Sequence, residues 1–172
     1  MDILTIASDG SCLKNPGGAI GWAWGDSKGR WMSNGIPTGT NQRAELLGFA
    51  SILVAFPNTP LHVQLDSQYT LNIASNWIHS WAKANWKRKE PLKNLDIIQP
   101  MHKLLLARTQ PLTFEWVKGH NKHGLNTVAD VRCGEASRRS QKSGLVTGNY
   151  LDSTGATSSV KQDKMLEAFG LL

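Results

Sequence analysis

The chain has 172 residues, which predicts one domain large enough to bury a core without disulfide bonds. Its 19 lysine and arginine residues outnumber its 13 aspartate and glutamate residues, and the charge of +6 favours a polyanionic partner. Two cysteines exclude a disulfide scaffold and a cysteine-based zinc site. The N-terminus shows no signal-peptide pattern, and the longest mostly apolar run is too short to span a bilayer. We therefore expect a cytoplasmic protein without membrane association.

Residues 1–34 predict an antiparallel meander. The predicted strands, which are rich in β-branched or alternating apolar side chains, cover 4–8, 19–24 and 30–34. The turn signal Asp9-Gly10-Ser11 follows the first strand, a second turn lies at 15–18, and a hairpin loop covers 26–29.

A helical hydrophobic period follows the meander. Residues 42–56 carry apolar side chains on one face, with Thr40 or Asn41 as the N-cap and Pro57 as the stop signal. The later patterns predict a strand at 61–65, helices at 68–80 and within 91–107, a strand at 112–117 and a helix at 126–141. This order, β-β-β-α-β-α-α-β-α, indicates a mixed α/β domain.

The composition changes after the predicted main domain, 1–142. Residues 143–160 are rich in serine, threonine and glycine, which predicts a flexible linker. Residues 161–172 regain an apolar spacing and predict a short amphipathic helix or tail, with Met165, Leu166 and Phe169 on one face. This last segment either folds back on the core, docks to a protein partner, or frays.

Four carboxylates fall near the ends of predicted elements: Asp9, Glu45, Asp66 and Asp130. Ligand sites in open α/β sheets form outside strand ends, so Asp9 and Asp66 can share one crevice. Convergent carboxylates need a compensating charge, which Mg²⁺ supplies, and two such ions can hydrolyse a phosphodiester. From spacing alone, turn or cap roles remain open, as does neutralisation by Arg43 or Lys118.

A glycine-bracketed stretch, GHNKHG at 119–124, contains two histidines. A mobile imidazole at His120 can shuttle a proton near phosphate at neutral pH, with His123 as the weaker candidate. The alternative is an exposed loop histidine without a role. Neither histidine has the spacing of a zinc motif.

Residues 77–94 hold most of the excess positive charge. Five lysine and arginine residues oppose only Glu90, so this segment contributes +4 of the total +6. Trp81 and Trp86 are interleaved with the cations. The cations are expected to attract phosphates, while the tryptophans either pack against sugars or form a small core of their own.

The chain resembles type 1 ribonuclease H in five motifs that occur in the family order. They are SDGSCLKNPGGAIGWAW at 8–24, TNQRAEL at 40–46, LDSQY at 65–69, WIHSWAKANWKRKEPLKNLDI at 77–97 and FEWVKGHNKHGLNTVAD at 114–130. The fourth is similar to the basic protrusion of the bacterial enzymes. The resemblance covers about residues 3–140.

The resemblance implies a ribonuclease H-like fold, a five-stranded mixed β-sheet flanked by helices on both sides. It also implies hydrolysis of the RNA strand of RNA–DNA hybrids with two Mg²⁺ ions, for which Mn²⁺ can substitute, leaving 5′-phosphate and 3′-hydroxyl ends. By motif match, the metal ligands are Asp9, Glu45, Asp66 and Asp130. His120 matches the family histidine that assists proton transfer and product release. We expect the protein to act as a monomer.

The resemblance further implies contacts with the hybrid. Asn15, Asn41 and Gln68 match polar positions in the minor groove, where 2′-hydroxyls distinguish RNA from DNA. The other implied contacts are two backbone-approach positions, a phosphate-pocket residue and four residues of the protrusion: Gly10, Cys12, Thr40, Trp81, Lys87, Arg88 and Lys89. Thr38 stands where the family often has an arginine, which predicts a weaker phosphate pocket.

Two other functions remain open at this point. A non-catalytic hybrid-binding module on the same fold is expected to lack at least one carboxylate, and all four are present here. Resolvase, integrase and transposase nuclease domains share the acidic chemistry but lack this combination of motifs. The sequence VRCGEA after Asp130 departs from the family pattern, although the offset from His120 fits without a gap.

Overall fold

The computed structural model describes residues 1–119, 124–151, 157–158 and 164–171, and these contain one mixed sheet of seven strands. The strands are β1 (Leu4–Cys12), β2 (Ile20–Asp26), β3 (Trp31–Ile36), β4 (Leu61–Leu65), β5 (Leu112–Trp116), β6 (Thr147–Leu151) and β7 (Thr157–Ser158). The helices are α1 (Asn41–Ala55), α2 (Gln68–Asn72), α3 (Ile78–Lys83), α4 (Leu95–Ala107), α5 (Leu125–Ser143) and α6 (Lys164–Ala168), with a π-helical turn η1 (Ile73–Trp77) between α2 and α3.

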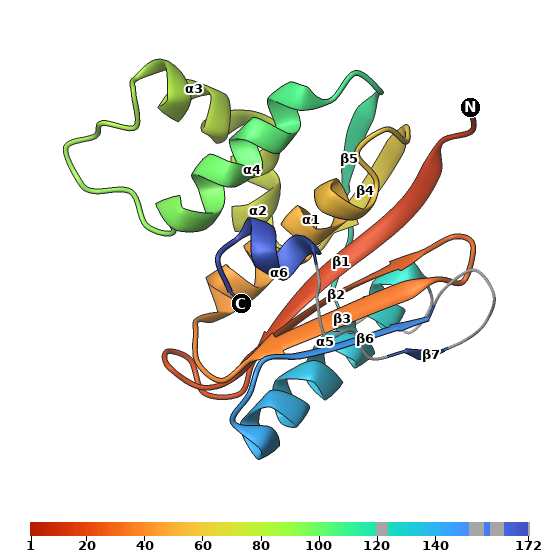
Figure 1. Ribbon diagram of the computed structural model, residues 1–172. Helices are drawn as coiled ribbons and strands as arrows, with labels where there is room; N and C mark the ends of the chain where they lie inside the picture. The colour runs from red at the N-terminus through yellow and green to blue at the C-terminus, as the bar shows by residue number, and fades with distance from the viewer. Residues whose placement is uncertain (120–123, 152–156, 159–163, 172) are drawn as a thin grey trace.

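The strands follow the order β5-β4-β1-β2-β3-β6-β7, with β1 parallel to β4 and antiparallel to β2. Helix α1 covers one face of the sheet and α5 covers the other (Figure 1). The expected mixed α/β fold with helices on both sides is confirmed. The sheet has more than the five expected strands, because two short strands from the C-terminal segment pair beyond β3.

Close approach of the helices to the sheet depends on glycines. A Cβ atom on Gly21 in β2 would lie 2.2 Å from the carbonyl oxygen of Cys133, and one on Gly35 in β3 would lie 2.4 Å from that of Ala136. Helix α5 therefore rests directly on the backbone of two strands. The main apolar core lies on the other side, where α1 packs against the sheet and is buried on most of its surface.

The C-terminal segment contains the expected short helix, but part of the expected flexible linker, 147–151, is a strand. Residues 147–151 pair antiparallel with β3, because a short edge strand needs backbone hydrogen bonds rather than bulky side chains. Helix α6 packs on α1, and the three apolar side chains that predicted it are buried: Met165, Leu166 and Phe169. The segment therefore folds back on the core, and its apolar face is not available to dock a protein partner.

Truncation after Gly144 is expected to destabilise the protein. It removes β6 and the three buried apolar side chains of 165–169, each worth about 1.5–3 kcal/mol when fully buried. We expect the melting temperature to fall by roughly 10 °C or more. In the full chain, Leu166→Ala should also lower the melting temperature, whereas Leu145→Ala, at an exposed position, should leave it almost unchanged. An unchanged melting temperature after truncation would contradict the packing described above.

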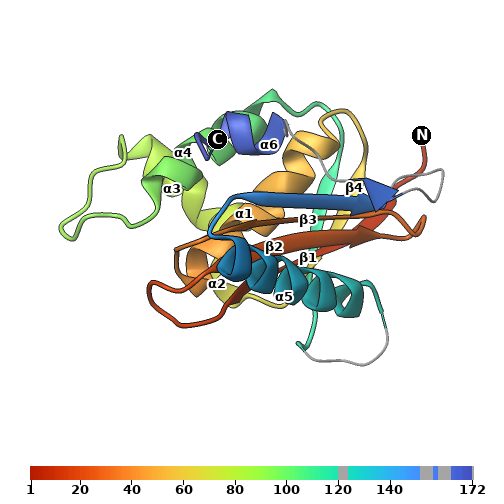
Figure 2. The same cartoon turned by 60° about the horizontal axis from the view of Figure 1, so that its bottom comes forward.

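The basic protrusion, 77–94, extends from the main domain next to α4, and its Ile78 is buried in the main apolar core. Helix α2, η1 and α3 run as one continuous element, and the loop after α3 returns to α4 (Figure 2). Ser67 caps this element, accepting a hydrogen bond from the Thr70 amide at 3.1 Å.

Among the described residues, none of the helices combines the length and apolar character that a membrane span requires.

Candidate active site

The pairing of β1 with β4 brings two of the predicted carboxylates side by side. The last parallel register pair joins Ser8 to Leu65, so Asp9 and Asp66 take the next positions on the two strands. Asp9 does not end its strand as the sequence predicted, because β1 continues to Cys12 in its pairing with β2. On the β4 side the pairing thus stops at Leu65, just before Asp66, while β1 continues to Cys12.

Helix α1 brings Glu45 to the same place. Gly10 permits this approach, since a Cβ atom there would lie only 2.4 Å from the Glu45 amide nitrogen. Glu45 is the fifth residue of α1, one position beyond the first turn in which it was expected. One carboxylate oxygen from each of Asp9, Glu45 and Asp66 lies within 4.8 Å of the other two. The structure therefore confirms that these three predicted side chains converge.

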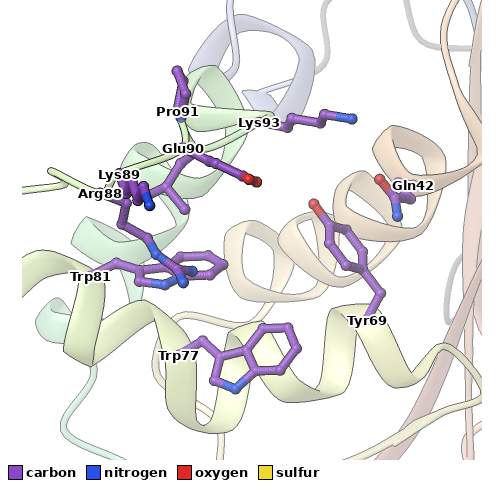
Figure 3. A pocket seen from close by; sticks show the side chains of 10 residues that line it. Gln42, Tyr69, Trp77, Trp81, Arg88, Lys89, Glu90, Pro91 and Lys93 are labelled. Carbon is purple, nitrogen blue, oxygen red and sulfur yellow. The ribbon is translucent and has the colours of Figure 1, made fainter.

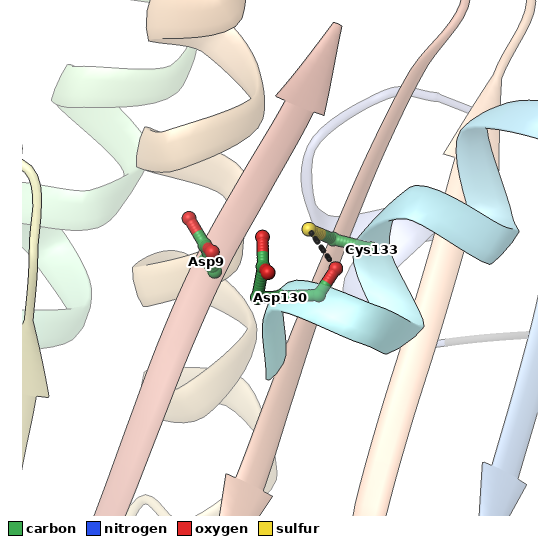
Figure 4. A group of neighbouring side chains, drawn as sticks. All are labelled: Asp9, Asp130 and Cys133. Atoms are coloured by element: carbon green, nitrogen blue, oxygen red, sulfur yellow. Dashed lines mark hydrogen bonds between the residues drawn. The ribbon is translucent and has the colours of Figure 1, made fainter. Parts of the chain in front are cut away.

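Asp130 approaches Asp9 from the opposite face of the sheet. It lies in the second turn of α5, and Asp9, Asp130 and Cys133 each place one ligand atom within 4.8 Å of the others (Figure 4). The Cys133 thiol donates a hydrogen bond to the Asp130 carbonyl oxygen at 3.2 Å. Asp9 thus belongs to both groups and stands at the centre of all four carboxylates. Sequence reasoning missed Cys133, although its position three residues after Asp130 on a helix was a usable signal.

The cluster carries more negative charge than its surroundings compensate. Asp9 is only 5% exposed, and burial, followed by the charges of Asp66 and Asp130, raises its pKa to about 8. The Gly10 amide donates to Asp9 Oδ1 at 2.8 Å and offsets part of this shift. Burial and the charges of Asp9 and Asp66 likewise raise the pKa of Glu45 well above its usual value. A bound cation would relieve this repulsion.

The donor set fits a hard divalent cation. Asp9, Glu45 and Asp66 offer only carboxylate oxygens, the ligands that Mg²⁺ prefers. Burial and the neighbouring carboxylates raise the pKa of the Cys133 thiol, which keeps it protonated and disfavours it as a ligand. The alternative of charge neutralisation by Arg43 is wrong, since its two terminal nitrogens bind Asp96 at 2.9 and 2.7 Å.

The loop after β5 passes directly beside Asp66. The Trp116 indole nitrogen donates to the Asp66 carbonyl oxygen at 3.1 Å, and a Cβ atom on Gly119 would lie 3.0 Å from Asp66 Oδ2. His120 follows Gly119 in the chain but lies outside the described residues. Its role in proton transfer therefore stays a prediction.

Comparison with known proteins decides the family. A family model described as RNase H matches residues 1–138. The chain belongs to the RNase H family and is a ribonuclease H enzyme. The resemblance seen in the five sequence motifs is therefore confirmed.

Curated relatives support this membership, and solved structures support the fold. A ribonuclease H from Tropheryma whipplei (strain Twist) is 35% identical over 138 residues, covering 78% of this chain and 84% of the relative. One from Rhodopseudomonas palustris (strain TIE-1) is 40% identical over 133 residues, covering 73% and 83%. The fold matches the N-terminal RNase H domain of rv2228c from Mycobacterium tuberculosis, with a TM-score of 0.63 and 22% identity over 84% of this chain and 99% of that one. It also matches LC9-RNase H1, a type 1 RNase H with the type 2 active-site motif, with a TM-score of 0.66 and 19% identity over 97% and 84%.

Five of the residues matched to hybrid contacts in the RNase H family lie on β1, in the loop after it or at the start of α1, and a sixth, Gln68, begins α2. Asn15 Oδ1 accepts a hydrogen bond from the Asn41 amide at 3.2 Å, which joins the loop after β1 to the start of α1. Thr40 caps α1 by accepting from the Arg43 amide at 3.2 Å. The other three positions in this region are Gly10 and Cys12 on β1 and the exposed Gln68 two residues after Asp66. Their binding roles stay predictions.

The protrusion forms a pocket of about 600 Å³ together with helices α1 and α2 (Figure 3). Trp81, Arg88 and Lys89 line it together with Gln42 of α1 and Tyr69 of α2. The Arg88 guanidinium lies 5.9 Å from the centroid of the Trp81 ring, within cation–π distance. The lining combines aromatic faces with positive charge.

A network of polar side chains connects the pocket to α1, the helix that carries Glu45. Arg43, beside Gln42 and two residues before Glu45, also donates to Asn94 Oδ1 at 3.4 Å. Asn94 in turn donates to the Tyr69 hydroxyl at 3.1 Å. The network links α1, α2 and the end of the protrusion loop, so it fixes the protrusion relative to the carboxylates.

Proposed function

We propose that the protein hydrolyses the RNA strand of RNA–DNA hybrids at the carboxylate cluster, with two Mg²⁺ ions, leaving 5′-phosphate and 3′-hydroxyl ends. The observation that carries the proposal is the convergence of Asp9, Glu45 and Asp66 within 4.8 Å, with Asp130 on the far side of Asp9, in a chain of the RNase H family. Glu45 and Asp66 lie near Asp9 in one group and Asp130 lies near it in the other, which supports two neighbouring metal positions that share Asp9.

Each carboxylate has a distinct task in this proposal. Asp9 and Asp66 would hold both ions, and Glu45 and Asp130 would each complete one position; Asp9 is the residue that belongs to both groups of neighbouring donors. Bound divalent ions supply a nucleophilic water and stabilise the leaving oxygen of the phosphodiester. The Gly10 amide fixes the Asp9 carboxylate, and the strand pairing keeps Asp66 beside it. His120, which follows Gly119 in the sequence, assists proton transfer and product release.

Selectivity for a hybrid follows from the contacts around the cluster. Asn15, Asn41 and Gln68 offer amide groups next to the carboxylates, where they can hydrogen-bond 2′-hydroxyls of the RNA strand. Backbone groups at Gly10 and Cys12 extend this contact. The aromatic and basic pocket of the protrusion then holds the DNA strand.

Neutralising Lys87, Arg88 and Lys89 together to glutamine is expected to raise KM and leave kcat nearly unchanged. Each lost phosphate contact should flatten the logarithmic salt dependence of binding by about 0.9. Steady-state kinetics over a salt series measure both quantities. A control that neutralises three exposed lysines elsewhere, Lys28, Lys103 and Lys164, should alter neither quantity. An unchanged KM in the Lys87/Arg88/Lys89 variant would remove the protrusion from the substrate site.

Analysis of the product ends tests the proposed chemistry. A hybrid with labelled RNA is incubated with Mg²⁺, with Mn²⁺ or with chelator, and the fragments are treated with enzymes that require a 5′-phosphate or a 3′-hydroxyl. We expect metal-dependent fragments that carry both groups. Cyclic or 3′-phosphate ends would exclude the proposed attack by water. Hybrid binding without cleavage in either metal would favour the non-catalytic alternative.

A further inference from the structure

One face of α5 carries a cluster of positive charge that the proposed function does not use. We call it the α5 basic face, and it consists of Arg132, Arg138, Arg139 and Lys142, with Glu135 among them. At about 100° per residue, these positions share a sector of about 120°. The residues of α5 that are buried against the sheet lie on its other side, and they include Cys133, Ala136, Ser137 and Ser140. The basic face therefore lies outside the side of α5 that is buried against the sheet, with Arg132 and Arg139 at the edge next to β3.

Arg132 and Arg139, the two partly buried arginines of this face, are held in place by side-chain contacts. Arg132 donates to Glu135 at 3.1 Å and lies 3.9 Å from the centroid of the Trp31 ring. Arg139 donates to the Ser33 hydroxyl at 2.9 Å. Arg138 and Lys142 are exposed, and a shallow hollow of about 390 Å³ lies between Glu135 and the last three cations. The face thus combines fixed charges with two extended side chains that can reach a ligand.

Two cations of the α5 basic face lie further along the helix that carries Asp130. Arg138 and Lys142 lie about 12 and 18 Å along the helix from Asp130, at a rise of about 1.5 Å per residue. The hydroxyl of Ser137 lies 3.3 Å from that of Ser11, so this part of α5 contacts the end of β1. The loop after β1, which carries Lys14 and Asn15, lies beside the C-terminal half of α5 in both views (Figures 1 and 2). The protrusion lies on the other face of the sheet, so the carboxylates separate two basic surfaces.

We propose that the α5 basic face binds the phosphate backbone of the RNA–DNA hybrid on the side of the carboxylates opposite the protrusion. This inference rests on the proposed function, since it adds a second contact to the same substrate. The hollow is lined, among the described residues, by Glu135, Arg138, Arg139 and Lys142 without an aromatic side chain, which suits phosphates rather than stacked bases. Continuity with the loop that carries Asn15 favours the substrate duplex over a separate anionic partner.

The test compares two variants of equal charge. Arg138→Gln/Lys142→Gln removes the exposed cations of the face, and Lys28→Gln/Lys103→Gln removes two exposed cations elsewhere. Hybrid affinity is measured without divalent metal, and KM with Mg²⁺, over a series from about 50 to 200 mM salt. We expect the first variant to raise Kd and KM about threefold or more and to flatten the logarithmic salt slope by about 2. The control should match the wild type, and both variants should keep its melting temperature.

The outcomes separate this inference from the proposed function. If the wild type fails to cleave hybrids, the proposed function fails, while the affinity measurement still tests the α5 basic face. If the wild type cleaves hybrids but the Arg138/Lys142 variant keeps its Kd, KM and salt slope, the inference is overturned and the face serves another anion. An equal effect in the Lys28/Lys103 control would also overturn it, because the effect would then report net charge alone.

Discussion

Asp9→Asn is expected to stabilise the metal-free protein at pH 8 while abolishing hydrolysis. Burial and neighbouring carboxylates raise the pKa of Asp9 from 3.8 to about 8 in the folded state. Between these two values the folded state binds a proton that the unfolded state does not, so stability falls as pH rises. Asparagine cannot ionise. The free energy of unfolding of Asp9→Asn should therefore exceed that of the wild type by an amount that grows from near zero at pH 4 to a few kcal/mol at pH 8. The same substitution removes the ligand shared by both metal groups.

Thermal unfolding from pH 4 to pH 8, with and without Mg²⁺, measures this effect. Bound Mg²⁺ should raise the melting temperature of the wild type most at pH 8, and of Asp9→Asn much less. Asp2→Asn, at an exposed carboxylate, should behave like the wild type at every pH. An identical pH dependence for the wild type and Asp9→Asn would show that the carboxylates do not repel one another as described.

Gly10→Ala is expected to damage both the fold and the site. The new Cβ atom would lie 2.4 Å from the Ala44 carbonyl carbon and the Glu45 amide nitrogen, so α1 must move away from β1. Such overpacking costs about 1–3 kcal/mol or more. The shift also displaces the Glu45 carboxylate, and a displacement of about 1 Å can reduce a catalysed rate about a hundredfold. We therefore expect a lower melting temperature together with a large fall in kcat.

Gly134→Ala provides the matched control for this substitution. Its Cβ atom would lie 3.3 Å from the flexible guanidinium of Arg138, and the position is inside α5. An alanine in a helix interior is more stable than a glycine by about 0.5–1 kcal/mol, so the control should unfold at an equal or higher temperature. Wild-type kcat and stability in Gly10→Ala would contradict the role given to the close approach of α1.

The sequence predicted the bounds of helices and strands well where the spacing of apolar residues is regular. The strand at 61–65 has the predicted bounds, and α1 starts and ends within one residue of its prediction. The Asp9-Gly10-Ser11 run was misleading, because Gly10 serves a close helix contact inside a strand rather than a turn. The edge strand β6 was missed because its polar composition resembles that of a linker, and only the free edge of β3 explains it.

The candidate site depended on information beyond local pattern. Spacing placed the four carboxylates near element ends but could not show that they converge, since this depends on the register of β1 with β4 and on the packing of two helices. The family motifs supplied the missing assignment. The sequence could not predict which carboxylate Arg43 binds, because its partner Asp96 is distant in sequence. The contribution of Cys133 to the surroundings of Asp130 likewise appears only once α5 is formed.

The most direct test of the central claim is a comparison of substrates in Mg²⁺. Labelled RNA–DNA hybrid, double-stranded RNA, double-stranded DNA and both single strands are incubated with the wild type and with Asp66→Asn. We predict cleavage of the hybrid RNA strand alone, and its loss in Asp66→Asn, because the site then lacks a carboxylate beside Asp9. Cleavage of any other substrate at a similar rate, or hybrid cleavage that survives in Asp66→Asn, would contradict the proposed active site.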